Sequence, residues 1–204
     1  MYLLCFFLQQ KAIFVVLATI KMVEEDFGWF YAGCRTCNKM VVTKGKYLEV
    51  VGEDVETVEK APPDSLWCTK CKFQATSIIP RFKVQVRVQD GTGSVSLVLF
   101  ERDVNRLVGL SSNDIRERQL KAEETDKFPY ELNRMVNKLV AFRVEVDEYN
   151  RDNTYHVYTV KNTTDAPSVI DELVKSNAVT NDEVQILNCH ISWFPYTFLK
   201  LSSD

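Results

Sequence analysis

Residues 81–100 read RFKVQVRVQDGTGSVSLVLF, and their alternation of polar and apolar side chains is the strongest fold signal in the chain. In an extended strand, successive side chains point to opposite faces. The tetrapeptide DGTG at 90–93 has the composition of a tight hairpin turn. We therefore predict an antiparallel hairpin of two strands, residues 81–89 and 94–100. The side chains predicted to point inward are Phe82, Val84, Val86, Val88, Val95, Leu97 and Leu99.

The outward face of this hairpin is predicted to be basic and partly aromatic. Arg81, Lys83 and Arg87 take outward positions on the first strand, and Phe100 takes one on the second. An outward phenylalanine is poorly explained by folding alone, so Phe100 marks a candidate binding surface. Two alternatives stay open: Phe100 packs against the following helix, and the basic stripe is an ordinary solvated strand face. The remaining outward positions are Gln85, Gln89, Ser94, Ser96 and Val98.

Three more segments are predicted to be strands, which makes five in all. They are residues 13–23, 139–146 and 154–161, the last after a turn at 150–153. In 139–146, the inward side chains are Phe142, Val144 and Val146, and the outward ones Arg143 and Glu145. Helices are predicted over 103–110, within 111–127, as a turn over 130–136, and over 167–175. Five strands with a helix after the third favour a small closed barrel of the OB type, although the composition also fits an open β-sandwich.

Four of the six cysteines form two C-x2-C pairs, Cys34 with Cys37 and Cys68 with Cys71. A spacing of two residues lets one tight turn direct both thiolates at the same ion, and two such turns complete a tetrahedral set. Because four thiolates leave no position for water or substrate, we predict one structural Zn²⁺. A redox pair and the disulfides of a secreted protein are the alternatives, but two such pairs together favour zinc.

The cysteine pairs are predicted to lie in a zinc ribbon inserted into the barrel at residues 30–79. Residues 40–51 and 70–79 are expected to form its strands. Between them, residues 52–64 are acidic and end in two prolines, so we expect an exposed loop.

The composition narrows the class of protein. The chain has 204 residues, 46% of them hydrophobic and 26% charged, which is typical of a globular domain. A net charge of −3 argues against a polybasic protein that binds nucleic acid through bulk charge. An aromatic content of 11% leaves stacking on unpaired bases open. The apolar run at 12–20 is about half as long as a membrane span, so we expect no membrane partner.

From about residue 16 to residue 175 the sequence resembles the C-terminal DNA-binding domain of the large subunit of replication protein A. The spacing between the cysteine pairs is longer here than in many relatives. The resembling motifs, in chain order, are GWFY at 28–31, CNK at 37–39, CTKC at 68–71, RFKV at 81–84, DGTG at 90–93, FE at 100–101, LVG at 107–109, FRV at 142–144 and YN at 149–150.

This resemblance implies a mainly β protein: a five-stranded OB-fold barrel with an inserted four-cysteine zinc ribbon and short flanking helices. It places the barrel at 12–166, a C-terminal helix at 167–176 and a tail of uncertain structure at 177–204. It implies binding of single-stranded DNA in replication, repair or recombination, in the nucleus, with Phe100 and Tyr149 stacking on bases. Other replication protein A subunits are implied as partners through the last helix.

Two other functions are weighed against DNA binding. A zinc hydrolase needs an open metal position and a general base, and four cysteines offer neither, so we expect no enzyme. A protein-interaction module that keeps the fold but binds little DNA, using the helix at 167–176, is the alternative we retain.

Overall fold

The computed structural model describes residues 12–52, 55–146, 150 and 156–180. The chain divides into two compact units, which we name the barrel unit and the ribbon unit. The barrel unit comprises Met1–Gly28, Val84–Gly109 and Tyr130–Asp204, and the ribbon unit comprises Trp29–Lys83 and Leu110–Pro129. Within the described residues, no helix is long and apolar enough to cross a membrane.

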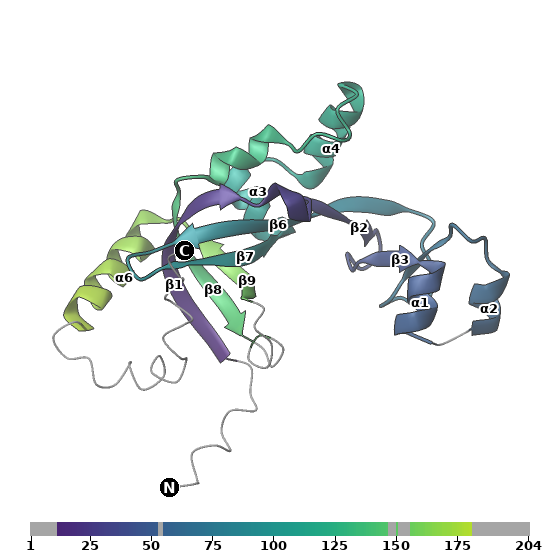
Figure 1. Ribbon diagram of the computed structural model, residues 1–204, viewed down its shortest axis with the longest axis horizontal. Helices are drawn as coiled ribbons and strands as arrows, with labels where there is room; N and C mark the ends of the chain where they lie inside the picture. Colours follow the sequence, from purple (N-terminus) through teal and green to yellow (C-terminus); the bar gives the residue numbers. More distant parts are fainter. Residues whose placement is uncertain (1–11, 53–54, 147–149, 151–155, 181–204) are drawn as a thin grey trace, which may run out of the picture. The chain divides into compact units, whose positions relative to one another are not determined.

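The barrel unit is built on five strands in the order β1-β8-β9-β7-β6, and β1 also pairs with β6. This last pairing, which runs from Thr19 opposite Gln89 to Val23 opposite Val86, closes the sheet on itself (Figure 1). The closed barrel confirms the predicted OB-type fold class and excludes the open sandwich. The strands are β1 (Ala12–Val23), β6 (Ile78–Gln89), β7 (Ser94–Phe100), β8 (Leu139–Val146) and β9 (Val157–Thr164).

The barrel core follows the predicted alternation on most strands. The inward side chains named for the first strand of the hairpin and for residues 139–146 are all buried, as are Leu97 and Leu99. Val95, next to the turn, is only half-buried. Two outward polar side chains depart further from the prediction, because Gln85 is 7% exposed and Ser96 is 4% exposed. The chain just beyond the end of β1 covers this part of the outer face: the backbone N–H of Glu24 donates to the Gln85 carbonyl oxygen, and Ser96 donates to the Glu24 carboxylate.

The hairpin turn between β6 and β7 forms where the sequence predicts it. The backbone N–H of Asp90 donates to the Gly93 carbonyl oxygen at 3.0 Å. Asp90 Oδ1 accepts from the backbone N–H of Thr92, from its hydroxyl and from the N–H of Gly93. An aspartate that satisfies turn N–H groups in this way fixes the loop length, and the loop length sets the strand register.

Short helices complete the barrel unit. The helix after β7, α3 (Glu101–Val108), buries Val104 and Leu107, and it ends at Gly109 in the left-handed conformation with φ 79°. Its last carbonyl oxygens accept from Lys138 and Arg134. The other elements are η2 (Glu25–Phe27), η3 (Tyr130–Met135) and α6 (Pro167–Thr180), the last of which runs past the residue 175 predicted as its end.

The ribbon unit departs most from the prediction. Residues 40–51 form only a three-residue strand followed by a helix, and residues 55–60 of the expected loop form a second helix. The reason is a small core of Tyr47, Val58 and Trp67, in which the Tyr47 and Trp67 rings lie 5.3 Å apart. The elements are β2 (Phe30–Cys34), β3 (Val41–Thr43), α1 (Lys44–Val50), α2 (Val55–Lys60), β4 (Leu66–Cys68), β5 (Phe73–Gln74) and α4 (Ser112–Lys121).

Two interactions tie the ribbon unit together beside its small cores. Strand β2 pairs with the first part of β6, from Phe30 opposite Phe82 to Cys34 opposite Ile78. Helix α4 lies against this pair, since the Ser112 hydroxyl donates to a β6 carbonyl oxygen and a guanidinium of α4 lies 5.4 Å from the centre of the Phe30 ring.

Candidate metal centre and nucleic-acid interface

The two cysteine pairs adopt the same local turn. In each, the residue after the second cysteine is left-handed: Asn38 has φ 61° and Lys72 has φ 59°. The N–H of Asn38 donates to the Cys34 carbonyl oxygen at 2.8 Å, and that of Lys72 donates to the Cys68 carbonyl oxygen at 2.9 Å. The left-handed residue closes each turn, so both thiols of a pair point to the same side.

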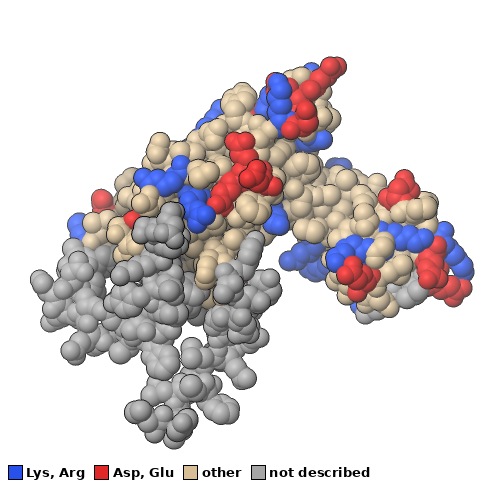
Figure 2. Space-filling view, in the orientation of Figure 1, with Lys and Arg blue, Asp and Glu red and all other residues tan. Residues whose placement is uncertain are grey.

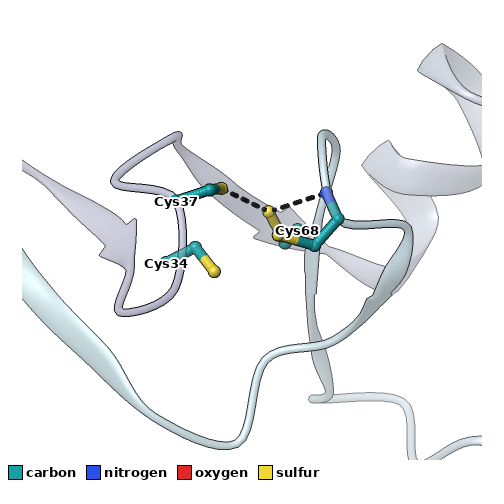
Figure 3. A group of neighbouring side chains, drawn as sticks. Cys34, Cys37 and Cys68 are labelled. Carbon is teal, nitrogen blue, oxygen red and sulfur yellow. Dashed lines mark hydrogen bonds between the residues drawn. The ribbon is translucent and has the colours of Figure 1, made fainter.

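These turns bring four thiols together. The four sulfur atoms of Cys34, Cys37, Cys68 and Cys71 all lie within 4.8 Å of one another. Figure 3 shows Cys34, Cys37 and Cys68 pointing toward one another from two chain segments. The Cys37 and Cys68 sulfur atoms are 3.4 Å apart, well beyond a disulfide bond, and all four cysteines are free. The arrangement therefore favours a metal site over the alternative of disulfides.

The spacing of the sulfur atoms fits a tetrahedral metal ion. Four sulfur ligands at about 2.3 Å from zinc stand about 3.8 Å from one another. Cys34 and Cys68 are buried, and they pack with Val41 in a cluster that fixes both turns. The donor set therefore suits a closed metal centre.

The pKa values of the thiols differ within the cluster. Hydrogen bonding by the Cys37 backbone N–H lowers the pKa of Cys34 to about 6, which favours its thiolate. Burial raises the pKa of Cys68, and the side chain of Cys37, more than burial, raises the pKa of Cys71 to about 12. Four thiolates at this separation repel one another, so a bound cation is what allows all four to lose their protons.

Gly33, directly before Cys34, leaves room for the side chain of Arg81. A Cβ added at Gly33 would lie 2.5 Å from Arg81 Cγ and 3.3 Å from the Ile79 carbonyl oxygen. Strands β2 and β6 are paired here, and Tyr31 lies opposite Arg81. The stem of Arg81 therefore crosses β2 in the space that a glycine leaves.

The predicted DNA-contacting residues are distributed over both units. Arg81, which is partly buried, and Lys83, which is exposed, stand on the part of β6 that belongs to the ribbon unit. Arg87 stands on the part of β6 in the barrel unit, and its side chain is 38% exposed. Tyr149 lies outside the described residues. The set of DNA-contacting residues therefore stays a prediction. Two of its members, Arg87 and Phe100, stand on the neighbouring strands β6 and β7 of the barrel.

Phe100 ends β7 and is the N-cap residue of α3, with an extended backbone. Its side chain is partly exposed. This position is compatible with stacking on a base and with packing against α3, so the two alternatives raised from the sequence both stand. On the face of the molecule that Figure 2 shows, Lys and Arg lie interspersed with Asp and Glu rather than in one basic patch.

One charged residue beside Arg87 was missed from the sequence. Glu24, just after β1, forms an ion pair with Arg87, with 3.3 Å between Oε1 and Nε, and accepts a hydrogen bond from Ser96 at 3.0 Å. No spacing rule points to Glu24, because the contact depends on the register of β1 against β6. The acidic cluster EED at 24–26 is the only sequence signal.

Several known proteins are similar to this chain. The sequence model of the family described as "Replication factor-A C terminal domain" matches residues 13–169. A replication protein A 70 kDa DNA-binding subunit from Oryza sativa subsp. japonica is 26% identical over 184 residues, which cover 89% of this chain and 26% of the relative. Another 70 kDa DNA-binding subunit, from Arabidopsis thaliana, is 22% identical over 151 residues, covering 73% and 22%. The chain thus spans about a quarter of the length of these curated relatives.

The fold is also found among solved structures. A structure described as "Structure and Conformational Change of a Replication Protein A Heterotrimer Bound to ssDNA" matches with a TM-score of 0.56 and 20% sequence identity. The match covers 84% of this chain and 36% of the other chain. At this identity the likeness concerns the fold, and it agrees with the closed barrel described above.

Proposed function

We propose that this chain, which belongs to the replication factor-A C terminal domain family, binds single-stranded DNA on the outer face of β6 and β7. The observation that carries the proposal is a closed barrel with Phe100 partly exposed on β7 and Arg87 on the adjoining β6. OB folds bind oligonucleotides on this pair of strands and the neighbouring loops. Support also comes from relatives that are DNA-binding subunits of replication protein A.

The proposed mechanism is stacking assisted by a few charges. Phe100 offers an aromatic face to an unpaired base, and such a stack contributes roughly 1–3 kcal/mol. Arg81, Lys83 and Arg87 supply the phosphate contacts. Because every base has a π-face, sequence preference should be weak. Tyr149 belongs to the proposal as a second stacking residue, through the resemblance of its motif.

We propose zinc as the ion of the four-cysteine centre, held by Cys34, Cys37, Cys68 and Cys71. Zinc bound by four thiolates contributes folding free energy and has no open position for a reacting group. For that reason we assign the chain no enzymatic reaction. The zinc stabilises the ribbon unit rather than contacting DNA.

Membership of the family supports a proposal for the wider role. We place the chain in the DNA metabolism of the nucleus, in replication, repair or recombination, with single-stranded DNA as ligand. The terminal helix α6 favours a second activity, because its Val169 is 38% exposed and its Val174 49% exposed. Apolar side chains in these positions suit assembly with other subunits. A protein-interaction module with little DNA binding is therefore the competing function.

A comparison of two aromatic substitutions tests the proposal. Phe100→Ala should weaken binding of labelled oligo-dT by roughly 1–3 kcal/mol and leave the salt dependence unchanged, because stacking involves no phosphate. Tyr130→Ala is the matched control, since Tyr130 is 66% exposed and lies on η3 rather than on a strand. Thermal unfolding of both variants is measured alongside. If Phe100→Ala binds as tightly as Tyr130→Ala and the wild type, DNA binding by stacking at Phe100 is wrong.

A further inference from the structure

A carboxylate lies across the strand face that we assign to DNA. Glu24 follows β1, and its backbone N–H donates to the Gln85 carbonyl oxygen of β6 at 2.9 Å. Its side chain is 13% exposed, and Oε1 accepts from the Ser96 hydroxyl of β7 at 3.0 Å. The Glu24 side chain therefore spans β6, from the end of β1 to β7.

The Glu24 carboxylate forms an ion pair with Arg87, a basic residue of the same face. Oε1 of Glu24 lies 3.3 Å from Nε of Arg87. Within the part of the chain that the structure describes, Glu24 is the only acidic residue paired with Arg87. Because the contact is made through Nε, the two terminal nitrogens of the guanidinium are the groups left to meet a phosphate.

The pair is held by more than proximity. Glu24 Oε2 is buried and, among the described residues, has no hydrogen-bond partner. A buried carboxylate oxygen without a donor is costly, and among the described residues Arg87 supplies the positive charge that is paired with this anion. A half-buried pair is also screened less by salt than an exposed one. Arg87 is therefore not a free cation on the barrel face.

We propose that Glu24 sets the strength and salt dependence of single-stranded DNA binding by neutralising Arg87. A phosphate that approaches the terminal nitrogens of Arg87 meets a fixed carboxylate on the same guanidinium, and the two anions repel each other. Glu24 thus acts through Arg87 without touching the nucleic acid. This inference rests on the proposed function and adds a residue that limits the affinity of the face.

The test uses a glutamine that keeps the shape of Glu24 and removes its charge. Labelled oligo-dT is titrated at several salt concentrations against the wild type, Glu24→Gln and Glu25→Gln. Glu25 is the matched control, because it is the exposed neighbour and makes no ion pair with Arg87 among the described residues. Glu24→Gln should bind about 3- to 10-fold tighter, because it frees a cation for phosphate. The slope of log K against log salt should steepen by about 0.7, the value of one phosphate contact on a single strand.

Two further variants assign the effect to the pair. In an Arg87→Gln background, Glu24→Gln should change the affinity no more than Glu25→Gln does. Arg87→Gln alone should lower the salt slope by clearly less than 0.7, because Glu24 weakens the contact between Arg87 and phosphate, whereas loss of an unpaired cation would lower it by about 0.7. Thermal unfolding checks that each variant is folded. If Glu24→Gln does not fold, the salt slope of Arg87→Gln alone decides the test.

The outcomes separate this inference from the proposed function. If the wild type binds and Glu24→Gln behaves like Glu25→Gln, or binds more weakly than the wild type, the role of Glu24 is overturned while DNA binding stands. If neither the wild type nor Glu24→Gln binds oligo-dT, both proposals fail together. Tighter binding with a steeper slope, lost in the Arg87→Gln background, supports both.

Discussion

The barrel unit and the ribbon unit draw their stability from different sources. In the barrel unit, five strands contribute alternate side chains to one apolar interior, and residues such as Leu99 and Phe142 are 0% exposed. Around the cysteine turns of the ribbon unit, the buried cluster among the described residues consists of Cys34, Val41 and Cys68. Two of these three are metal ligands in our assignment. The buried side chains of the barrel unit are thus mainly hydrophobic, while the cluster at the cysteine turns consists mostly of residues that we assign to the metal.

The comparison teaches that one chain can combine two kinds of sequence signal. The periodic alternation of apolar side chains encodes the barrel unit, and the spacing of cysteines encodes the metal site of the ribbon unit. Alternation repeated over long strands specifies a barrel without reference to any ligand. Two C-x2-C pairs specify four converging thiols, but they contribute little apolar area to hold the turns together. Removal of the metal should therefore affect the two units differently.

Loss of the metal should give the largest difference between the units. The purified chain should contain one zinc, and a strong chelator should unfold the ribbon unit, because metal binding and ribbon folding are linked. Trp29 and Trp67 both lie in the ribbon unit, so their fluorescence reports on it, in a Trp193→Phe background. Hydrogen exchange of the β8 backbone reports on the barrel unit, and its protection should persist.

Cysteine substitutions provide the control for chelation. Cys68→Ser should lose zinc and give the same fluorescence change without a chelator, while Cys5→Ser, outside the two pairs, should retain the metal. If the chain contains no zinc and Cys34 is found in a disulfide, the metal assignment is wrong. Parallel loss of protection in β8 would show that the units do not differ as we describe.

Truncation of a core side chain in the barrel unit should lower stability by an amount that does not depend on zinc. Phe142→Ala removes a fully buried ring from β8 and should cost about 3–5 kcal/mol of unfolding free energy. The loss should be similar with and without zinc, because Phe142 lies in the other unit from the cysteines. Chemical denaturation measured in both conditions checks this, and a cost that disappears on chelation would contradict it.

A substitution at Gly33 tests whether β2 supports the turn that holds Cys34 and Cys37. Gly33→Ala places a Cβ against the stem of Arg81 and against the β6 backbone, and overpacking of this kind typically costs about 1–3 kcal/mol. Chelator competition should show weaker zinc retention, because β2 carries Cys34. Ala32→Gly, at the preceding residue of the same strand, is the control for a change in β2 that adds no side chain. Unchanged zinc retention in Gly33→Ala would mean that Arg81 relocates freely.

The smallest expected effect concerns the cap of α4. The Ser111 side chain accepts from the Asp114 N–H, and the Asp114 carboxylate accepts from Ser111, which lowers the pKa of Asp114. Ser111→Ala should cost about 1 kcal/mol, typical of a lost N-cap. A carboxyl with a depressed folded pKa contributes stability above its unfolded pKa and loses it as pH falls through the folded pKa. The difference between Ser111→Ala and the wild type should therefore shrink in acid, and a difference independent of pH would exclude the Asp114 carboxylate as a contributor to it.

Much of the barrel was predictable because its signal is local. Alternation identified the buried side chains of β6 and β8, and DGTG identified the turn between β6 and β7. Parity placed Gln85 and Ser96 on the outer face but did not predict their burial, because it gives the face of a side chain and not what covers that face. Here Glu24 covers the outer face, and that contact depends on which residues of β1 and β6 stand opposite each other.

In the ribbon unit, the four cysteines of the metal centre were predictable from the sequence, but the helices were not. Spacing alone found the four cysteines, since two short turns are sufficient to gather them. The helices α1 and α2 were missed because Tyr47, Val58 and Trp67 stabilise them from positions distant in sequence. Lys44 also donates to the carbonyl oxygens of Glu59 and Ala61 at the end of α2, another contact across the insertion. Neither contact leaves a periodic signal in the sequence.

The most direct test of the central claim is a competition between single-stranded and duplex DNA. Labelled oligo-dT is titrated with the zinc-loaded chain, and unlabelled single strand or unlabelled duplex of equal length is added as competitor. Stacking of Phe100 on a base requires that the base be unpaired, so the single strand should compete much more strongly, with little dependence on its sequence. Competition by duplex that equals or exceeds that of the single strand would contradict the assignment of the barrel face to single-stranded DNA.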